Sequence, residues 1–520
     1  MLHVQQIDRD FKLGPDSLTP LIHANFCPSD AQLKNAREIL FQAERTIKTM
    51  QLELAQLDGA GDSLSDSVYA DRVGLCLWEQ SAAEGRATQM RFILSPWRRL
   101  PRELQTEIFL LCVYEHLDAA PATNRAPLLL LHVCRSWRAV VLGTPEIWTM
   151  MCYHIDREED IRFIENWISR SGVYPLQLRI TAALPRQAGD SLGGPPKLFG
   201  KVKQLVEKHM HRLQTLRLDM PHDYSALLLH GAPLLYALEF DANLWKRGAL
   251  WNRDPQPQWG VNSLPALRQL TFRPTCKPSY RFPWRQLTSL SLLGEMMPQS
   301  TLQILSQCPA LITFRLSFVG FLPYAAGHET TAILPALQEL YASSSSPVQE
   351  QAIETVFSAL TLPELRVLDI RARTLYSFDT IGPLLQRSAC HLDKLSIDAE
   401  DVDQLSILQY IRSVSGTLTS LALRVRGAEI KSYGSLLRSL TLVTDLGGES
   451  LCPNLETILL AGVSWMPDGL LADMVESRWR GGKRSVLKRV VWPNCRFSHA
   501  EHTGRLERLR DEGLEIYSLS

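Results

Sequence analysis

A short unit with the pattern L-x-x-L-x-L recurs from residue 213 onward and constrains the fold more than any other feature. Its clearest copies start at Leu213, Leu235, Leu267, Leu287, Leu311, Leu365, Leu392, Leu418 and Leu455, and weaker copies start at Leu337 and Leu487. Most starts lie 20 to 28 residues apart, with longer steps where an insertion is expected. A unit this small cannot bury its own apolar face, so neighbouring units must stack. The spacing predicts an irregular solenoid of short parallel strands and helices.

Proline marks the entry to many of these units. Six copies carry it two residues before the first leucine, as Pro233, Pro265, Pro309, Pro335, Pro363 and Pro453. Because proline cannot continue a helix, we expect it to end the helix that precedes each strand. A globular α/β domain with coincidental leucine spacing is the alternative, and the recurrent proline favours the solenoid.

The residues between the leucines are expected to point away from the core. In three copies they are polar: Gln214, Thr215 and Arg217, then Arg268, Gln269 and Thr271, then Asp393, Lys394 and Ser396. A mixture of charge and hydroxyl groups suits protein recognition. A merely solvated face would have the same composition, so these positions do not identify a partner.

The segment 94–150 is predicted to form three short helices. Pro101 suits a first helical turn, and Leu104, Ile108 and Leu111 then fall on one helical face. A second helix is expected from Pro127, with an apolar stripe of Leu130, Val133, Cys134, Trp137 and Val141. Thr144-Pro145-Glu146 is predicted to cap a last short turn that carries Ile147 and Trp148. These apolar stripes are wide for fewer than sixty residues, which indicates that one of them is covered from outside.

Four submotifs occur in order in this segment: Leu100-Pro101-x-Glu103-Leu104, Ile108-Phe109, Val133-Cys134-Arg135-x-Trp137-Arg138 and Thr144-Pro145-x-Ile147-Trp148. The segment closely resembles an F-box, the adaptor-binding motif of SCF ubiquitin ligases. Leu94-Ser95-Pro96 before the motif resembles the form common in basidiomycete fungi. The resemblance covers about a tenth of the chain. It departs from the usual pattern at Ile147, where leucine is commoner, and in a longer loop after the first helix.

The resemblance implies an adaptor-binding surface made of Leu100, Pro101, Leu104, Ile108, Phe109, Val133, Cys134, Trp137 and Trp148. The partners it implies are a Skp-type adaptor and, through it, cullin and RING subunits. The repeats resemble the leucine-rich-repeat domains of such F-box proteins, which implies a protein substrate bound there. We therefore expect the substrate-recognition subunit of an SCF-type E3 ubiquitin ligase that is itself no enzyme. The alternative is a leucine-rich-repeat scaffold unrelated to ubiquitin, whose F-box-like helices cap the solenoid.

Upstream of residue 94 the chain is expected to be irregular over 1–29 and helical over 30–58, with Ser29 or Asp30 as the cap. The helix has heptad spacing at Leu33, Ala36, Leu40, Ala43, Ile47, Met50, Leu54 and Leu57. It is either a dimerising or partner-binding coiled coil or an amphipathic helix lying on the F-box or the C-terminal domain. Alanine in the seam favours the second interpretation. Residues 59–93 are expected to contain a linker up to Tyr69 and a poorly patterned helix from Val73 to Phe92.

The repeat domain is expected to span residues 151–520. It should begin with a helix after Glu158 that buries Ile161, Ile164, Trp167 and Ile168. A strand with Leu176, Leu178 and Ile180 on one face is expected next.

The sequence gives no sign of catalysis or of a metal or cofactor site. Lys+Arg and Asp+Glu both number 55, which argues against a generally basic nucleic-acid-binding protein. The ten cysteines form no CxxC pair and no zinc spacing. The run Gly194 to Lys201 is one residue too long for a phosphate loop, and Val202 replaces the hydroxyl residue it needs. We expect no catalytic, cofactor-binding or metal-binding residues.

The chain shows no apolar run of about 18 residues, so no membrane span is expected. The charged residues near Met1 do not fit a signal peptide, which points to the cytoplasm or nucleus or both. One basic run extends from Arg478 to Arg489. It is either a nuclear import signal or acidic-partner patch, or a solvated loop between the last repeats, and the second interpretation is favoured.

Overall fold

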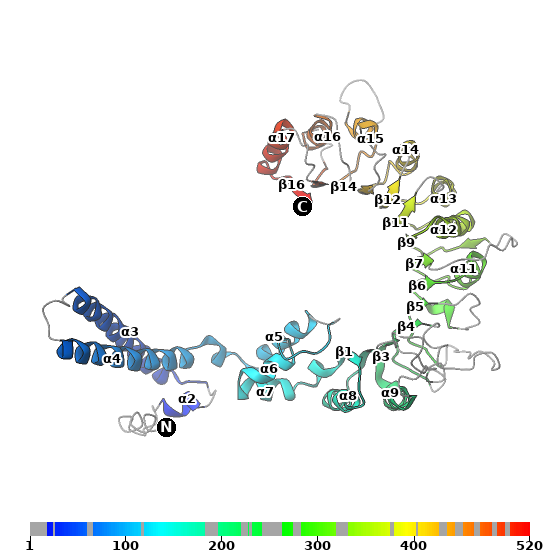
Figure 1. Ribbon diagram of the computed structural model, residues 1–520. Coiled ribbons are helices and arrows are strands. Elements are labelled where there is room, and N and C mark those ends of the chain that lie inside the picture. The colour runs from blue at the N-terminus through cyan, green and yellow to red at the C-terminus, as the bar shows by residue number, and fades with distance from the viewer. Residues whose placement is uncertain are drawn as a thin grey trace. The chain divides into compact units, whose positions relative to one another are not determined.

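The computed structural model of the chain (Figure 1) describes residues 18–23, 27–59, 66–115, 119–182, 196–219, 227, 231–241, 263–273, 282–318, 331–374, 379–401, 404–425, 434–442, 451–461, 469–480, 486–493 and 500–519. The chain divides into two compact units. The first contains Met1–Trp148 and Arg170–Gly172, and the second contains Thr149–Ser169 and Val173–Ser520. Most of the segment 1–29 that was expected to be irregular lies outside the described residues. No helix among the described residues is long and apolar enough to cross a membrane.

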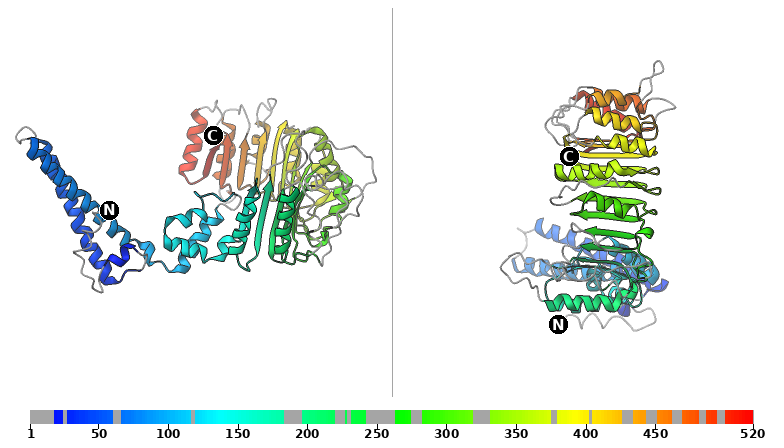
Figure 2. Two further views of the ribbon diagram at one scale, coloured as in Figure 1. Left: turned by 60° about the horizontal axis from the view of Figure 1, so that its bottom comes forward. Right: turned by 90° about the vertical axis from the view of Figure 1, so that its right-hand side faces the viewer.

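Two long helices dominate the start of the first unit. After the short helix α2 (Thr19–His23), α3 (Asp30–Gly59) and α4 (Asp66–Ile93) form an antiparallel hairpin (Figure 2). Ser29 caps α3, because its Oγ accepts from Gln32 N (3.2 Å) while Gln32 Oε1 accepts from Ser29 N (2.9 Å). The helix expected over 30–58 therefore exists with nearly the predicted bounds.

The heptad seam of α3 packs against α4 of the same chain. Leu33, Ala36, Ala43 and Leu57 are buried on α3, and Cys76, Ala83, Ala87 and Met90 are buried on α4. These α4 positions are seven, four and three residues apart, so α4 has a heptad seam of its own, made mostly of small side chains. The apolar seam expected on α3 is therefore covered by α4 of the same unit. The expected linker is also shorter, since α4 already begins at Asp66 and residues 60–65 are not described.

The rest of the first unit consists of short helices. They are η1 (Pro96–Arg99), α5 (Arg102–Tyr114), α6 (Leu128–Val133), α7 (Arg135–Leu142) and η2 (Pro145–Trp148). One continuous helix was expected from Pro127 across Cys134, and this was wrong. Cys134 is extended, with φ −158° and ψ 171°, and it separates α6 from α7. Its Sγ accepts from Trp137 N (3.4 Å), so the cysteine side chain caps the helix that follows.

The second unit is built on one parallel sheet whose 14 described strands follow each other in chain order. They are β1 (Met150–Ile155), β2 (Leu176–Ala182), β3 (Leu213–Asp219), β4 (Ala237–Asp241), β5 (Gln269–Arg273), β6 (Ser289–Gly294), β7 (Thr313–Phe318), β9 (Glu339–Ser343), β11 (Val367–Thr374), β12 (Lys394–Asp401), β13 (Ser420–Val425), β14 (Thr457–Ala461), β15 (Arg489–Pro493) and β16 (Glu515–Leu519). Two further short strands, β8 (Ala332–Ile333) and β10 (Leu360–Thr361), pair separately.

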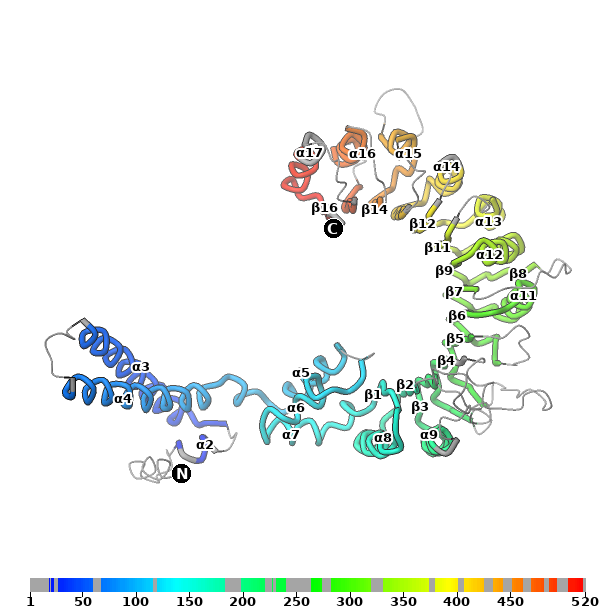
Figure 3. Tube along the Cα trace, in the orientation of Figure 1, coloured from blue at the N-terminus to red at the C-terminus, as the bar shows by residue number. Residues whose placement is uncertain are grey.

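Helices connect most of these strands and lie along the outer side of the curved sheet, with the strands on its inner side (Figures 1 and 3). They are α8 (Glu159–Arg170), α9 (Pro196–His209), α11 (Pro298–Leu305), α12 (Pro347–Ala359), α13 (Ile381–Ser388), α14 (Gln404–Ser413), α15 (Gly434–Leu440), α16 (Leu470–Trp479) and α17 (Ala500–Asp511), with the short turns η3 (Met210–Arg212) and η5 (Trp284–Gln286). The unit is therefore an α/β solenoid-like array, as the leucine spacing predicted. The helix after Glu158 and the strand at Leu176 are also confirmed.

All eleven leucine units contribute a strand, and their leucines form continuous buried columns. In β6, Leu290 lies opposite Leu270 of β5 and Phe314 of β7, and all three are buried. Burying a side chain of this size contributes roughly 1.5–3 kcal/mol. The stacking of neighbouring repeats therefore supplies the stability that a single repeat lacks. The strands β1 and β16 were not predicted, because neither carries the leucine spacing.

The recurrent proline occupies a β-turn and does not end a helix directly. In the unit at Pro309, Leu311 N donates to Cys308 O (3.3 Å), so the proline is the second residue of a four-residue turn. The same bond closes the turns at Pro233, Pro265, Pro335, Pro363 and Pro453. Proline favours this position because its ring sets φ near −65°. The sequence signal was correct, but its expected mechanism was wrong.

Three arginines join neighbouring repeats, and two of them, Arg212 and Arg478, are buried. Arg478 donates to Leu440 O (2.7 Å), Leu451 O (2.6 Å) and Cys452 O (2.7 Å), and burial lowers its pKa to about 10. Arg387 and Arg212 make equivalent bonds to carbonyls of the preceding unit. These bonds satisfy carbonyl groups that helix ends leave unpaired. Arg478 therefore belongs to the core and not to a solvated basic loop, while residues 481–485 of that run are not described.

Candidate functional site

The turn into α5 is held by its own backbone. Leu100 N donates to Trp97 O (3.2 Å), and Gln105 N donates to Pro101 O (3.1 Å). The buried side chain of Gln105 returns to Leu100 through a bond from Nε2 to Leu100 O (2.9 Å). Leu100 and Pro101 are thus fixed at the start of α5, with Pro101 exposed and Leu100 half-buried.

One face of α5 presents large apolar side chains to solvent. Leu104, Ile108 and Leu111 are 49%, 37% and 67% exposed, at a spacing that places them in one row along the helix. We call these three residues the apolar row. Tyr114 at the end of α5 is exposed as well. A soluble surface exposes single apolar residues freely, but a contiguous row indicates a binding face.

The opposite face of α5 packs into an aromatic cluster. Phe109 is buried, and its ring centroid lies 5.6 Å from that of Trp97 and 5.0 Å from that of Trp137. The two tryptophan rings are 4.7 Å apart. Aromatic pairs of this geometry contribute about 0.5–1.5 kcal/mol beyond their burial. The cluster therefore fixes the orientation of α5, and with it the apolar row, against α7.

The helix α6 adds to the exposed apolar surface of this unit. Leu129 and Val133 are exposed, whereas Leu130 between them is buried. The extended Cys134 follows Val133 directly, and Arg138 Nε donates to Leu131 O (2.8 Å) across the break. The break at Cys134 ends the helical face to which Val133 belongs, so Val133 and Trp137 do not share one stripe as was expected.

Trp148 is fully buried and donates through Nε1 to Val141 O (3.0 Å). Ile147 beside it is also buried. Thr144 does not cap the last turn through its side chain, because its Oγ1 donates back to Val140 O (2.8 Å). This corner closes the small core of the unit.

The nine residues predicted to bind the adaptor therefore differ in their exposure to solvent. Pro101, Leu104, Ile108 and Val133 are exposed, Leu100, Cys134 and Trp137 are half-buried, and Phe109 and Trp148 are internal. The structure gives Phe109 and Trp148 a packing role in which they support the exposed residues. Leu129 and Tyr114 were not among the predicted residues, although both are exposed. The run of four leucines from Leu128 contained a signal, because a helix cannot bury all of its sides in so small a unit.

Two groups of hydrogen-bond donors in η1, just before α5, lack partners within the described residues. They are Trp97 Nε1 and the guanidinium of Arg98, whose three nitrogens are all buried. Arg98 is only 5% exposed, and its Cζ lies 4.1 Å from the centroid of the Phe92 ring. Burial lowers the pKa of Arg98.

On the second unit, some of the predicted outward positions carry polar groups that are paired. Arg217 contacts Asp219 (2.6 Å) and Glu239 (2.7 Å), and Glu239 also contacts Arg273 (3.0 Å). Ser396 was expected to point outward but is buried.

A cavity of about 330 Å³ lies at the carboxyl ends of β9, β11 and β12. It is lined in part by Ser344, Arg371, Arg373 and Glu400. The Arg373–Glu400 ion pair (3.3 Å) places opposite charges side by side there. The charged residues that line the cavity, Arg371, Arg373, Asp398 and Glu400, are balanced in charge.

Among the described residues, no group of three or more His, Cys, Asp or Glu side chains could bind a metal ion. His154 contacts Thr181 Oγ1 (2.8 Å) and Asp156 (3.3 Å). Comparison with protein-family models finds no matching family, and no curated protein matches the chain.

Proposed function

We propose that this chain is the substrate-recognition subunit of an SCF-type E3 ubiquitin ligase. The first unit would bind a Skp-type adaptor, and the second would bind a protein substrate. The chain would perform no chemistry of its own. It would raise the effective concentration of the substrate near a ubiquitin-loaded enzyme, which is brought by the cullin and RING subunits.

The observation that carries this proposal is the apolar row on α5. Two of its residues, Leu104 and Ile108, belong to the F-box-like submotifs, and they are solvent-exposed although large and apolar. Exposing such side chains in a row is unfavourable unless a partner covers them. The buried aromatic cluster of Trp97, Phe109 and Trp137 pre-organises this face, which lowers the cost of binding.

The second unit supports the other half of the proposal. We assign its strand–helix units to leucine-rich repeats of the irregular kind, on the basis of the buried leucine columns. Its inner surface presents hydroxyl and charged groups on the parallel strands β3, β5 and β7, such as Thr215, Arg217, Thr271 and Arg315. A curved surface of this composition suits a folded or extended protein ligand.

The test is co-purification of the full-length chain with a Skp-type adaptor. The double variant Leu104→Ala, Ile108→Ala should lose adaptor binding while its circular dichroism stays unchanged. The matched control is Ile333→Ala, which truncates an exposed apolar residue of the second unit. Undiminished adaptor binding by the double variant would refute the proposal. A stable monomer without adaptor affinity would favour the scaffold whose F-box-like helices cap the solenoid.

A further inference from the structure

The guanidinium of Arg98 is the least satisfied polar group of the first unit among the described residues. Its Nε, Nη1 and Nη2 atoms are buried without a hydrogen-bond partner, and so is the neighbouring Trp97 Nε1. A buried, unpaired charge is strongly unfavourable, and proteins normally pair it or hydrate it. An arginine that only filled space here would be replaced at no cost by an apolar side chain. Its presence therefore points to a function in another state.

One movable side chain lies over the guanidinium. The ring of Phe92, near the end of α4, stands 4.1 Å from Arg98 Cζ and is itself 47% exposed. A cation–π contact replaces only part of the hydration that the charge has lost. Rotation of Phe92 toward solvent would uncover the guanidinium without any change of the backbone. The guanidinium is therefore covered on this side by a side chain that is itself half exposed.

Arg98 also lies next in the chain to the cluster that supports α5. The ring of the adjacent Trp97 contacts the rings of Phe109 of α5 and Trp137 of α7. A protein that covers the exposed Pro101, three residues after Arg98, would therefore approach Arg98 as well.

We propose that Arg98, together with Trp97 Nε1, binds an aspartate or glutamate carboxylate of the adaptor protein that covers the apolar row; this rests on the proposed function. The carboxylate would take the position now covered by Phe92 and accept two parallel hydrogen bonds from the guanidinium fork. A free anion would lose its hydration shell and gain only the contact with Arg98 in return. A protein carboxylate arrives with apolar surface that excludes water, and the buried ion pair fixes the orientation of the partner.

The experiment compares full-length variants for stability and for affinity to a purified Skp-type adaptor. Arg98→Met keeps the length of the side chain and removes the charge. The matched control is Arg99→Met, which removes the charge of the neighbouring exposed arginine. Arg98→Met should raise the melting temperature of the free chain but weaken adaptor binding by at least about 30-fold. Arg99→Met should change binding by at most about fivefold.

The outcomes separate this proposal from the proposed function. If wild type binds the adaptor, Leu104→Ala, Ile108→Ala abolishes binding and Arg98→Met binds like Arg99→Met, the function stands and the carboxylate site is refuted. If wild type does not bind any Skp-type adaptor, both are refuted. Arg98→Lys covers the case in which Arg98→Met fails to fold, because it keeps the charge but loses the fork. It should weaken binding about tenfold, and wild-type affinity in this variant would also overturn the proposal.

Discussion

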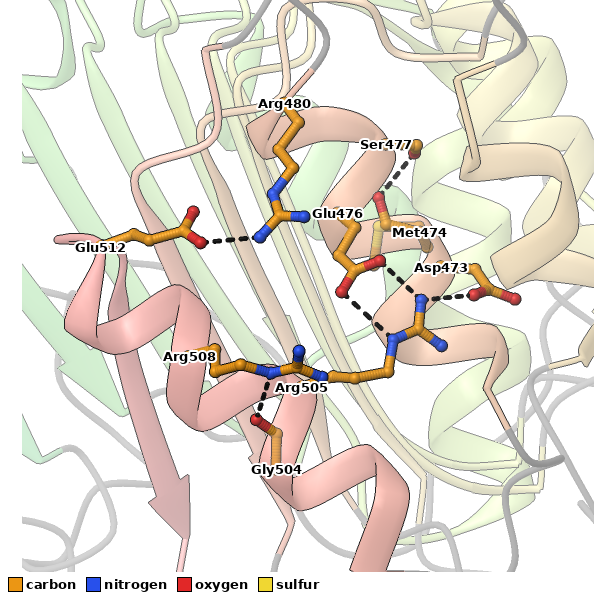
Figure 4. Close-up of polar contacts among 9 residues, drawn as sticks. All are labelled: Asp473, Met474, Glu476, Ser477, Arg480, Gly504, Arg505, Arg508 and Glu512. Atoms are coloured by element: carbon orange, nitrogen blue, oxygen red, sulfur yellow. Dashed lines mark hydrogen bonds and ion pairs between the residues drawn. The ribbon is translucent and has the colours of Figure 1, made fainter.

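Arg505 of α17 binds Glu476 of α16 through two parallel hydrogen bonds. Its Nη2 donates to Glu476 Oε2 (2.6 Å), and its Nε donates to Glu476 Oε1 (3.1 Å) (Figure 4). The same Nη2 also reaches Asp473 Oδ1 (2.7 Å). A second pair, Arg480 and Glu512 (2.6 Å), ties the end of α16 to the turn after α17. Ion pairs therefore attach the last described helix to the array, beside the buried residues Leu506 and Leu509.

Glu476→Gln should destabilise this end of the solenoid by about 1 kcal/mol. Both partners are partly shielded from water, so their bidentate pair is stronger than an ordinary surface pair. Hydrogen exchange of the amides in α17 measures the effect locally, and urea denaturation measures it globally. Glu507→Gln is the control, because Glu507 is an exposed acid on α17. Equal exchange rates in the two variants would contradict the expectation.

The contribution of Glu476 should depend on pH. A hydrogen bond from Arg505, opposed by burial, lowers the pKa of Glu476 from its usual 4.5. A lowered carboxyl pKa in the folded state adds stability that is complete well above pH 4.5 and is lost as pH falls through the folded-state pKa. The stability difference between wild type and Glu476→Gln should therefore be constant near neutral pH and shrink in acid. A difference that stays the same from neutral pH into acid would show that the pair contributes no charge-dependent stability.

Leu290→Ala should cost about 2–5 kcal/mol, because Leu290 is fully buried in a column between Leu270 and Phe314. Truncation leaves a cavity that the two neighbouring strands cannot close. Leu293→Ala on the same strand is the control, since Leu293 is only half-buried and should cost much less. Urea denaturation of both variants gives the comparison. Similar losses would mean that the leucine columns are not the main source of cohesion.

The repeat architecture could be predicted because the same three leucine positions recur in each repeat and mark the face that it buries. Where a strand packs without that spacing, as in β1 and β16, the sequence contained no comparable signal. The heptad pattern of α4 was also missed. Its seam residues Cys76, Ala83 and Ala87 are only weakly apolar, and they are buried because α3 packs closely against them. Small residues at a helix interface are visible as such only once the partner helix is known.

The candidate site was predictable in identity but not in orientation. The submotifs located Leu104, Phe109 and Trp137, and helical spacing puts Leu104 and Phe109 on different faces. Both faces are apolar, however, so the sequence does not show which of the two is buried. The break at Cys134 was hidden as well, since it contains neither glycine nor proline and depends on a sulfur cap. The buried state of Arg98 results from three-dimensional packing around Phe92 and could not be predicted from its position in a basic run.

Phe109→Ala tests a buried residue that supports the site, whereas Leu104→Ala tests a residue of its exposed surface. Phe109 is buried in the aromatic cluster with Trp97 and Trp137, so its truncation should destabilise the first unit by about 3–5 kcal/mol. Leu104 is half exposed in the free chain, so its truncation should leave stability within about 0.5 kcal/mol. Thermal denaturation followed by tryptophan fluorescence reports the cluster directly. If Leu104→Ala destabilised the chain as much as Phe109→Ala, Leu104 would belong to the core, and the apolar row would not be a free binding face.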